Sequence, residues 1–124
     1  MSRRGAPALP RLTDLQVLGL VRSGAYRVNL ETAEVVGPKG DVIKPWGVGR
    51  DRRFVRLYGF GGVRTIFVNK LVWMVGTDSL LPDGFEVHHR DFDRTNDRFG
   101  NLLALHKVDH KKMHNGFDDE EPPF

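Results

Sequence analysis

Residues 86–114 read EVHHRDFDRTNDRFGNLLALHKVDHKKMH and contain all five histidines of the 124-residue chain. His88 and His89 are adjacent, and Asn101 lies twelve positions after His89. His110 and His114 follow, four positions apart. Three imidazoles can hold one metal ion while a fourth transfers protons, which is the content of a hydrolytic metal site. The stretch therefore indicates metal-dependent hydrolysis.

His110 and His114 fall on a predicted helix over residues 108–115, where residues four apart share one face. This is the two-histidine geometry of helical zinc sites. The HExxH metalloprotease pattern is excluded because Lys111 stands at the position of its glutamate base. The pair taken alone also fits two exposed histidines on a helix surface.

His88 and His89 end a predicted strand over residues 86–89, whose partner strand is expected over residues 102–105. Adjacent side chains on a regular strand point to opposite faces, so both can serve one site only if the chain bends there. We therefore place the pair where the strand runs into the following loop. One imidazole can then bind metal while the other approaches a water.

The loop DFDRTNDRFG, residues 91–100, must connect these two strands back to back. Asn101 can both donate and accept hydrogen bonds, and so can pin the loop to the backbone near the two histidines. Asp91 could orient a ligand histidine or cap the loop, and we favour the structural role. The glycine and terminal glutamate of an EF-hand calcium loop are missing. The other polar residues are interpreted as turn residues, namely Asp93, Asn96 and Asp97.

The motifs HHRD, TND, NL and HxxxH occur in this order over residues 88–114. On these motifs the chain resembles the HNH endonucleases, also called ββα-metal or His-Me finger nucleases. Its histidine-rich form is similar to the nuclease domains of colicin toxins and to phage homing-type HNH proteins. A weaker similarity to the phage proteins reaches back to Tyr26 and includes residues 68–72, where Asn69 replaces a histidine.

The resemblance implies a role for each motif residue. His89 matches the general base that activates water, and Asn101 matches the asparagine that holds the loop and aims this base. The implied reaction cuts DNA phosphodiester bonds to 5′-phosphate and 3′-hydroxyl ends. Three imidazoles favour zinc or nickel by affinity, whereas magnesium prefers oxygen ligands, and manganese is a further candidate. The residues that match the ligands of the single divalent ion are His88, His110 and His114.

The residues before the motif predict one helix and several short strands. Thr13-Asp14 is an N-cap signal for a helix that Gly24 ends. A short apolar helical turn is expected over residues 70–74, ending at Gly76, and residues 59–62 (GFGG) are typical of a hairpin turn. Half-buried strands are expected over residues 26–30, 34–36, 53–58 and 63–68. The predicted class is α+β, with a small β-rich basic N-terminal portion followed by a ββα-metal (HNH) finger.

The chain is short enough for one domain. Residues 1–11 predict a flexible basic arm, residues 12–116 a single nuclease domain with its metal motif over 86–115, and residues 117–124 an acidic tail. There are no cysteines, no secretory signal, and no apolar run near the ~18 residues of a membrane span. We expect a soluble protein of the bacterial cytoplasm, phage-encoded, acting as a monomer or weak dimer.

The net charge of +3 is unevenly distributed. Residues 1–65 carry twelve Lys/Arg against five Asp/Glu, residues 66–116 carry seven of each, and residues 117–124 carry four acids and no base. A basic half favours contact with phosphates, and the alternative is a solvated face of a basic protein. Together with the metal motif, the charge predicts binding to double-stranded DNA through Arg50, Arg52, Arg53, Arg56, Arg90, Arg94, Lys107 and Lys111.

The tail FDDEEPPF, residues 117–124, resembles the acidic tip of bacterial single-stranded-DNA-binding proteins, which ends in Pro-Phe after several acids. It predicts docking on a replication or repair protein. The alternatives are screening of the basic face and a solubilising end.

The leading functional prediction is a metal-dependent HNH endonuclease that nicks or cleaves DNA, of phage homing or packaging-associated type. The rival is a non-catalytic, metal-stabilised DNA-binding or partner-recruiting module. That rival keeps His88, His110 and His114 but has no use for His89.

Overall fold

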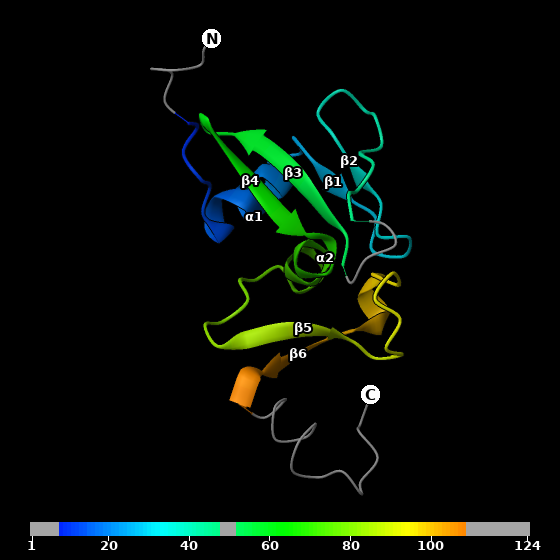
Figure 1. Ribbon diagram of the computed structural model, residues 1–124. Helices are drawn as coiled ribbons and strands as arrows, with labels where there is room; N and C mark the ends of the chain where they lie inside the picture. The colour runs from blue at the N-terminus through cyan, green and yellow to red at the C-terminus, as the bar shows by residue number, and fades with distance from the viewer. Residues whose placement is uncertain (1–7, 48–51, 109–124) are drawn as a thin grey trace, which may run out of the picture.

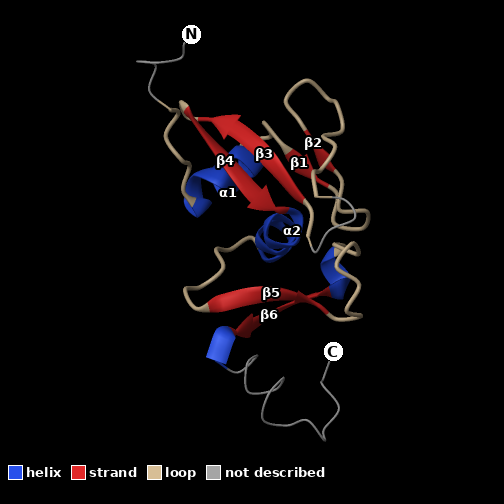
Figure 2. Cartoon of the chain, viewed as in Figure 1, coloured by secondary structure: helices blue, strands red, loops and turns tan. Residues whose placement is uncertain are grey.

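The computed structural model describes residues 8–47 and 52–108 of the chain. Within these residues the strands form three antiparallel two-stranded sheets, and α2 lies between the β3–β4 and β5–β6 hairpins (Figure 1). The elements in chain order are α1 (Asp14–Arg22), β1 (Arg27–Val28), β2 (Val35–Val36), β3 (Phe54–Gly59), β4 (Gly62–Phe67), α2 (Val68–Thr77), β5 (Phe85–His89), the 3₁₀-helix η1 (Phe99–Asn101) and β6 (Leu102–His106). This mixture of helices and small antiparallel sheets confirms the predicted α+β class (Figure 2).

α1 begins where the sequence predicts. The Thr13 hydroxyl accepts a hydrogen bond from the Gln16 backbone N–H at 3.1 Å, and the Gln16 side chain accepts from the Thr13 N–H at 2.9 Å. This reciprocal capping box satisfies two N–H groups that the first helical turn leaves without partners. The helix buries Val17, Leu18 and Leu20 in the core.

The β3–β4 hairpin supplies the apolar wall of the core. Its turn is formed by Phe60 and Gly61, whose φ angles of 49° and 73° match the twist of a two-residue hairpin. Val55, Leu57 and Ile66 alternate with exposed residues and are buried against the helices, as the period-two pattern predicts.

α2 is longer than the predicted turn over residues 70–74. It continues through Gly76 to Thr77 and is capped by Asp78, which adopts the left-handed conformation with φ 53°. Gly76 does not stop the helix because it serves a packing need, since a Cβ there would collide with the ring of Phe99. The helix thereby receives the end of the β5–β6 loop directly against its backbone.

The described end of the predicted arm pairs with β4. Leu12 N–H donates to the Val63 carbonyl at 3.0 Å, and Val63 N–H donates to the Pro10 carbonyl at 2.9 Å. Arg11 therefore bridges Val63 as a short parallel partner, so residues 10 and 11 of the predicted arm are attached to the sheet, and residues 1–7 lie outside the described residues. None of the helices in the described ranges is long and apolar enough to cross a membrane.

Candidate active site

His88 and His89 lie in the paired part of β5. His88 faces Leu103 across the ladder and His89 faces Leu102, so the expected bend between the two histidines is absent. Their side chains therefore point to opposite faces of the hairpin. Val87 and His89 face α2 and are 6% and 7% exposed. His89 is nevertheless the last residue of β5, at the point where the loop begins.

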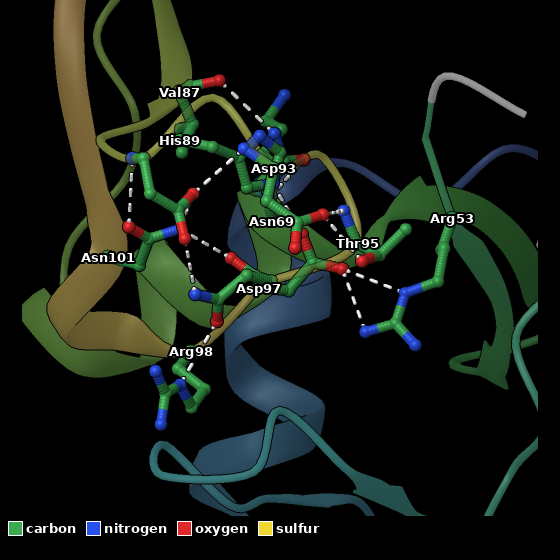
Figure 3. Close-up of polar contacts among 12 residues, drawn as sticks. Arg53, Asn69, Val87, His89, Asp93, Thr95, Asp97, Arg98 and Asn101 are labelled. Carbon is green, nitrogen blue, oxygen red and sulfur yellow. Dashed lines mark hydrogen bonds and ion pairs between the residues drawn. The ribbon is translucent and has the colours of Figure 1, made fainter. Parts of the chain in front are cut away.

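Asp97 lies between His89 and Arg53 (Figure 3). Its Oδ1 lies 2.6 Å from His89 Nε2, and its Oδ2 accepts from Arg53 Nε at 3.1 Å and forms an ion pair with Arg53 Nη2 at 3.0 Å. Asp97 is only 2% exposed. A buried carboxylate is stable when its oxygens are hydrogen-bonded and its charge is paired, and both conditions hold here.

Asn101 ties the two ends of the loop together. Its Oδ1 accepts from the Asp91 N–H at 3.2 Å, and its Nδ2 donates to Asp91 Oδ1 at 2.9 Å and to the Asn96 carbonyl at 2.8 Å. Its own carbonyl accepts from the Arg90 N–H at 2.7 Å. Asn101, just before β6, thus holds Arg90, the residue that follows His89.

Asp91 is the acceptor at the centre of this loop. Hydrogen bonds from the Asn96 side chain, the Asp93 N–H and the Asn101 side chain lower the pKa of Asp91 from 3.8 to about 2. The pKa of Asp93 is also lowered, chiefly by hydrogen bonds from Thr95. Both carboxylates are charged acceptors that hold the loop, which agrees with the structural role favoured for Asp91.

α2 fixes β5 from the core side. The Asn69 side chain donates from Nδ2 to the Val87 carbonyl at 3.1 Å, and its Oδ1 accepts from the Lys70 N–H at 2.7 Å. Asn69 is 4% exposed, so this bond to the residue before His88 is shielded from water.

The described part of the predicted metal set is His88. Its Nε2 lies 3.5 Å from Glu86 Oε1 on the same face of β5, since residues two apart on a strand share a face. An imidazole beside a carboxylate is a donor pair that suits divalent transition ions. His110 and His114 lie outside the described residues, and no three His, Asp or Glu side chains converge on a metal position within residues 8–47 and 52–108.

Comparison with known proteins gives one informative match. No family model and no curated protein matches the chain. Among solved structures, it matches one described as "DNA binding and cleavage by the HNH homing endonuclease I-HmuI", with a TM-score of 0.58, 24% sequence identity and coverage of 75% of this chain. The chain has an HNH-type nuclease fold. It spans about half of the matched chain, 54%.

Within the HNH-type fold, the predicted DNA-contacting residues separate into groups. Arg90 and Arg94 are exposed in the loop that follows His89, and Lys107 is exposed just after β6. Arg56 lies over the Trp46 ring at 4.9 Å, and Arg52 lies over the Phe67 ring at 5.1 Å. Arg50 and Lys111 lie outside the described residues.

Arg53 differs from the other arginines predicted to contact DNA, because it already has a carboxylate partner within the fold. Its guanidinium is turned inward and paired with Asp97. Arg53 lies two positions before Val55 and directly ahead of β3, so continuing the alternation of that strand would place its side chain on the inward face. The DNA contact of Arg53 stays a prediction, and its ion pair with Asp97 is the role that the structure shows.

Asp97 is the residue that sequence reasoning missed. The sequence predicts a turn residue at this position, because Thr95, Asn96 and Asp97 form a polar run between strands. No local pattern marks one aspartate of such a run as buried. The parity of Arg53 was the available signal, because an inward arginine requires a buried acceptor.

Proposed function

We propose that this chain is a metal-dependent HNH endonuclease that hydrolyses DNA phosphodiester bonds. The observation that carries the proposal is a histidine at the end of β5, held by a buried carboxylate and followed by a loop that Asn101 closes, in an HNH-type nuclease fold. A structure of the same fold is described as that of a DNA-cleaving enzyme.

His89 acts as the general base. A neutral imidazole takes a proton from water, and the water oxygen forms a bond to phosphorus while the bond to the 3′ oxygen breaks. The leaving oxygen keeps the bonding electron pair and is then protonated by solvent, so the products carry 5′-phosphate and 3′-hydroxyl ends. Asn101 keeps the base at the start of a closed loop.

His88, His110 and His114 would hold the divalent ion, with Glu86 beside His88. Because His88 and His89 point to opposite faces of β5, the proposal requires the phosphate to be reached from both faces at the end of the strand, where the loop begins. When bound, such an ion supplies positive charge for the phosphate and the leaving oxygen. The imidazole-rich set favours zinc or nickel by affinity, and magnesium or manganese remain candidates for turnover.

Double-stranded DNA is the proposed substrate. Arg90 and Arg94, which are exposed in the loop after His89, would hold phosphates beside the site, and Arg52, Arg56 and Lys107 would extend the basic surface. One such site cuts one strand at a time, so a double-strand break requires two protomers or two visits. The match to a homing endonuclease extends the proposal to a homing or packaging-associated role of a phage-type protein.

The test is conversion of supercoiled plasmid by metal-stripped protein supplied with magnesium, manganese, nickel or zinc. Wild type and His106→Gln should nick with at least one metal, whereas His89→Ala should be inactive while binding the same metal. His106 is the matched control because it belongs to the same hairpin and packs edge-on against Phe85, with ring centroids 5.2 Å apart. Equal nicking by wild type and His89→Ala would refute the proposed base.

A second function is favoured by the burial of His89. At 7% exposure, with its ring bonded to Asp97, His89 also fits a structural role in a metal-stabilised DNA-binding module. Such a module would bind DNA and metal but would not cut under any of the four metals. His89→Gln would then lower stability and leave DNA affinity unchanged in the folded protein.

The acidic tail of residues 117–124 is the proposed contact with a replication or repair protein. Its acids and Phe124 offer charge and an apolar anchor to a basic pocket. A synthetic peptide of residues 117–124 should bind such a partner, and a peptide lacking Phe124 should not. Unchanged cleavage after deletion of the tail, together with no peptide binding, would eliminate this role.

A further inference from the structure

We propose that Asp97 is a positioning residue that selects the tautomer of His89, with the proton on Nε2 and the lone pair on Nδ1. Arg53 holds Asp97 in the orientation that does this. The catalytic part of the inference rests on the proposed nuclease function, whereas the tautomer is a property of the folded protein alone.

The contacts of Asp97 with Arg53 and His89 locate the ring proton of His89. Asp97 Oδ2 already receives two N–H groups of one guanidinium, at 3.1 and 3.0 Å. Arginine has donors and no acceptors and stays charged in proteins, so the paired carboxylate presents an acceptor at Oδ1. A contact of 2.6 Å between Oδ1 and His89 Nε2 therefore requires the proton on Nε2.

A proton on Nε2 leaves Nδ1 of His89 as the basic nitrogen of the ring. A neutral imidazole has one N–H and one lone pair, so the lone pair lies on Nδ1. In the described part of the chain, the hydrogen bond to the His89 ring is the one at Nε2, and Nδ1 is not among the buried atoms that lack a partner. Nδ1 is thus the nitrogen that can take the proton of water.

Asp97 also lies beside the positive charge that would form on His89 during the reaction. After Nδ1 takes the proton, the ring carries a positive charge with N–H groups on both nitrogens. Asp97 lies in hydrogen-bond contact with this ring and is 2% exposed, so it stabilises the charge with little screening by water. In the resting state, when the imidazole is neutral, the charge of Asp97 is balanced by Arg53.

Arg53 also makes the network testable. In Asp97→Asn, the new side chain has one oxygen and one NH₂ group to direct at Arg53. The NH₂ group would face two N–H donors of Arg53 with no acceptor between them, so the oxygen should turn to the guanidinium. The NH₂ group then faces His89 Nε2, which must accept, and the ring proton moves to Nδ1. This substitution therefore inverts the tautomer at nearly constant volume and removes the lone pair from the reacting nitrogen.

The tautomer is read by long-range ¹⁵N–¹H NMR of histidine-labelled protein at about pH 8, above the ordinary imidazole pKa. The His89 signals are assigned by their loss in His89→Gln. Wild type should show a protonated Nε2 and an unprotonated Nδ1, and Asp97→Asn should show the reverse. Wild-type protein with the proton on Nδ1, or an unchanged ring in Asp97→Asn, would overturn the inference.

Activity provides the second readout. Asp97→Asn should reduce nicking about 100-fold, within the range that a general base supplies, while metal affinity and the unfolding midpoint stay close to wild type. The double variant, Asp97→Asn with Arg53→Gln, should nick at least tenfold faster than Asp97→Asn alone, because the oxygen of the new Asn side chain is then able to turn back to His89 Nε2. Asp83→Asn, an exposed aspartate in the turn before β5, is the charge-matched control.

The double variant separates positioning from general stabilisation. If Arg53 and Asp97 served folding alone, the nicking rate per folded molecule would be the same in the single and the double variant, and only the amount of folded protein would change. If wild type shows the expected tautomer but cuts no DNA with any metal, the nuclease function fails while the tautomer assignment stands. If wild type nicks but its tautomer is the opposite one, the positioning role fails while the nuclease function stands.

Discussion

The two long hairpins of this chain are closed by opposite means. β3 and β4 meet through the turn Phe60–Gly61, and the pair is held by apolar residues such as Leu57, which is fully buried. β5 and β6 are joined by residues 90–101, whose contacts are hydrogen bonds among aspartates and asparagines and a buried ion pair. The first hairpin stabilises the fold, and the second uses that rigid support to orient a histidine.

Polar networks and apolar ladders differ in what they determine. Burial of apolar area is non-directional, so it stabilises a fold without fixing the rotation of one ring. Hydrogen bonds are directional and, when shielded, costly to leave unmade. Substitutions in the β3–β4 hairpin should therefore mainly lower stability, whereas substitutions in the loop between β5 and β6 should mainly lower the nicking rate.

The largest stability effect is expected from Leu57→Ala in β3. Truncating this fully buried side chain should lower the free energy of unfolding by about 3 kcal/mol, as a cavity in the core does. Urea unfolding measures the change, and Leu80→Ala, at an exposed position, should change it by less than about 0.5 kcal/mol. The nicking rate per folded molecule should stay within twofold, and a large loss there would abolish the contrast between the hairpins.

The largest catalytic effect among the loop residues is expected from Asn101→Ala. Loss of its contacts with Asp91 and Asn96 releases the loop after His89, so nicking should fall about 100-fold. Stability should fall by only about 1 kcal/mol. Asn29→Ala is the matched control, because Asn29 caps the β1–β2 loop by accepting from the Glu31 and Thr32 N–H groups. Equal loss of nicking in both variants would show that Asn101 has no special position.

A smaller effect is expected from pH. The pKa of Asp91 is lowered from 3.8 to about 2 in the folded protein. Its contribution to stability is therefore present above about pH 4 and is lost as the pH falls towards 2. In Asp91→Asn this part of the acid dependence should vanish, as measured by thermal unfolding between these pH values. Asp83→Asn should keep the wild-type profile, and identical profiles for all three proteins would disprove the role of Asp91.

The smallest effect is expected outside the second hairpin, at Arg56. Replacing Arg56 by alanine should weaken DNA binding a few-fold and reduce the slope of log affinity against log salt by about 1. Arg27→Ala, at an exposed position of β1, serves as the control for loss of one surface charge. Identical slopes for wild type and Arg56→Ala would remove the outward face of β3 from the DNA-binding surface.

Much of the fold was predictable from local patterns. The N-cap at Thr13, the alternation along β3 and β4, and the pairing of residues 85–89 with 102–106 agree with the sequence analysis. Each is governed by neighbours in the chain or by a period of two residues. The length of α2 was not predictable, because Gly76 packs under Phe99, a residue far along the chain.

By itself, the sequence determined the HNH-type fold and the identity of His89 and Asn101 as site candidates, because their spacing is a local property of the chain. The tertiary structure alone decided the partner of His89. Arg53 and Asp97 are 44 positions apart. Nothing in the local sequence distinguishes Asp97 from the aspartates at 91 and 93, yet Asp97 is buried and those two are exposed. Burial and charge pairing arise when α2 brings the two hairpins together, and no periodicity of either segment records that contact.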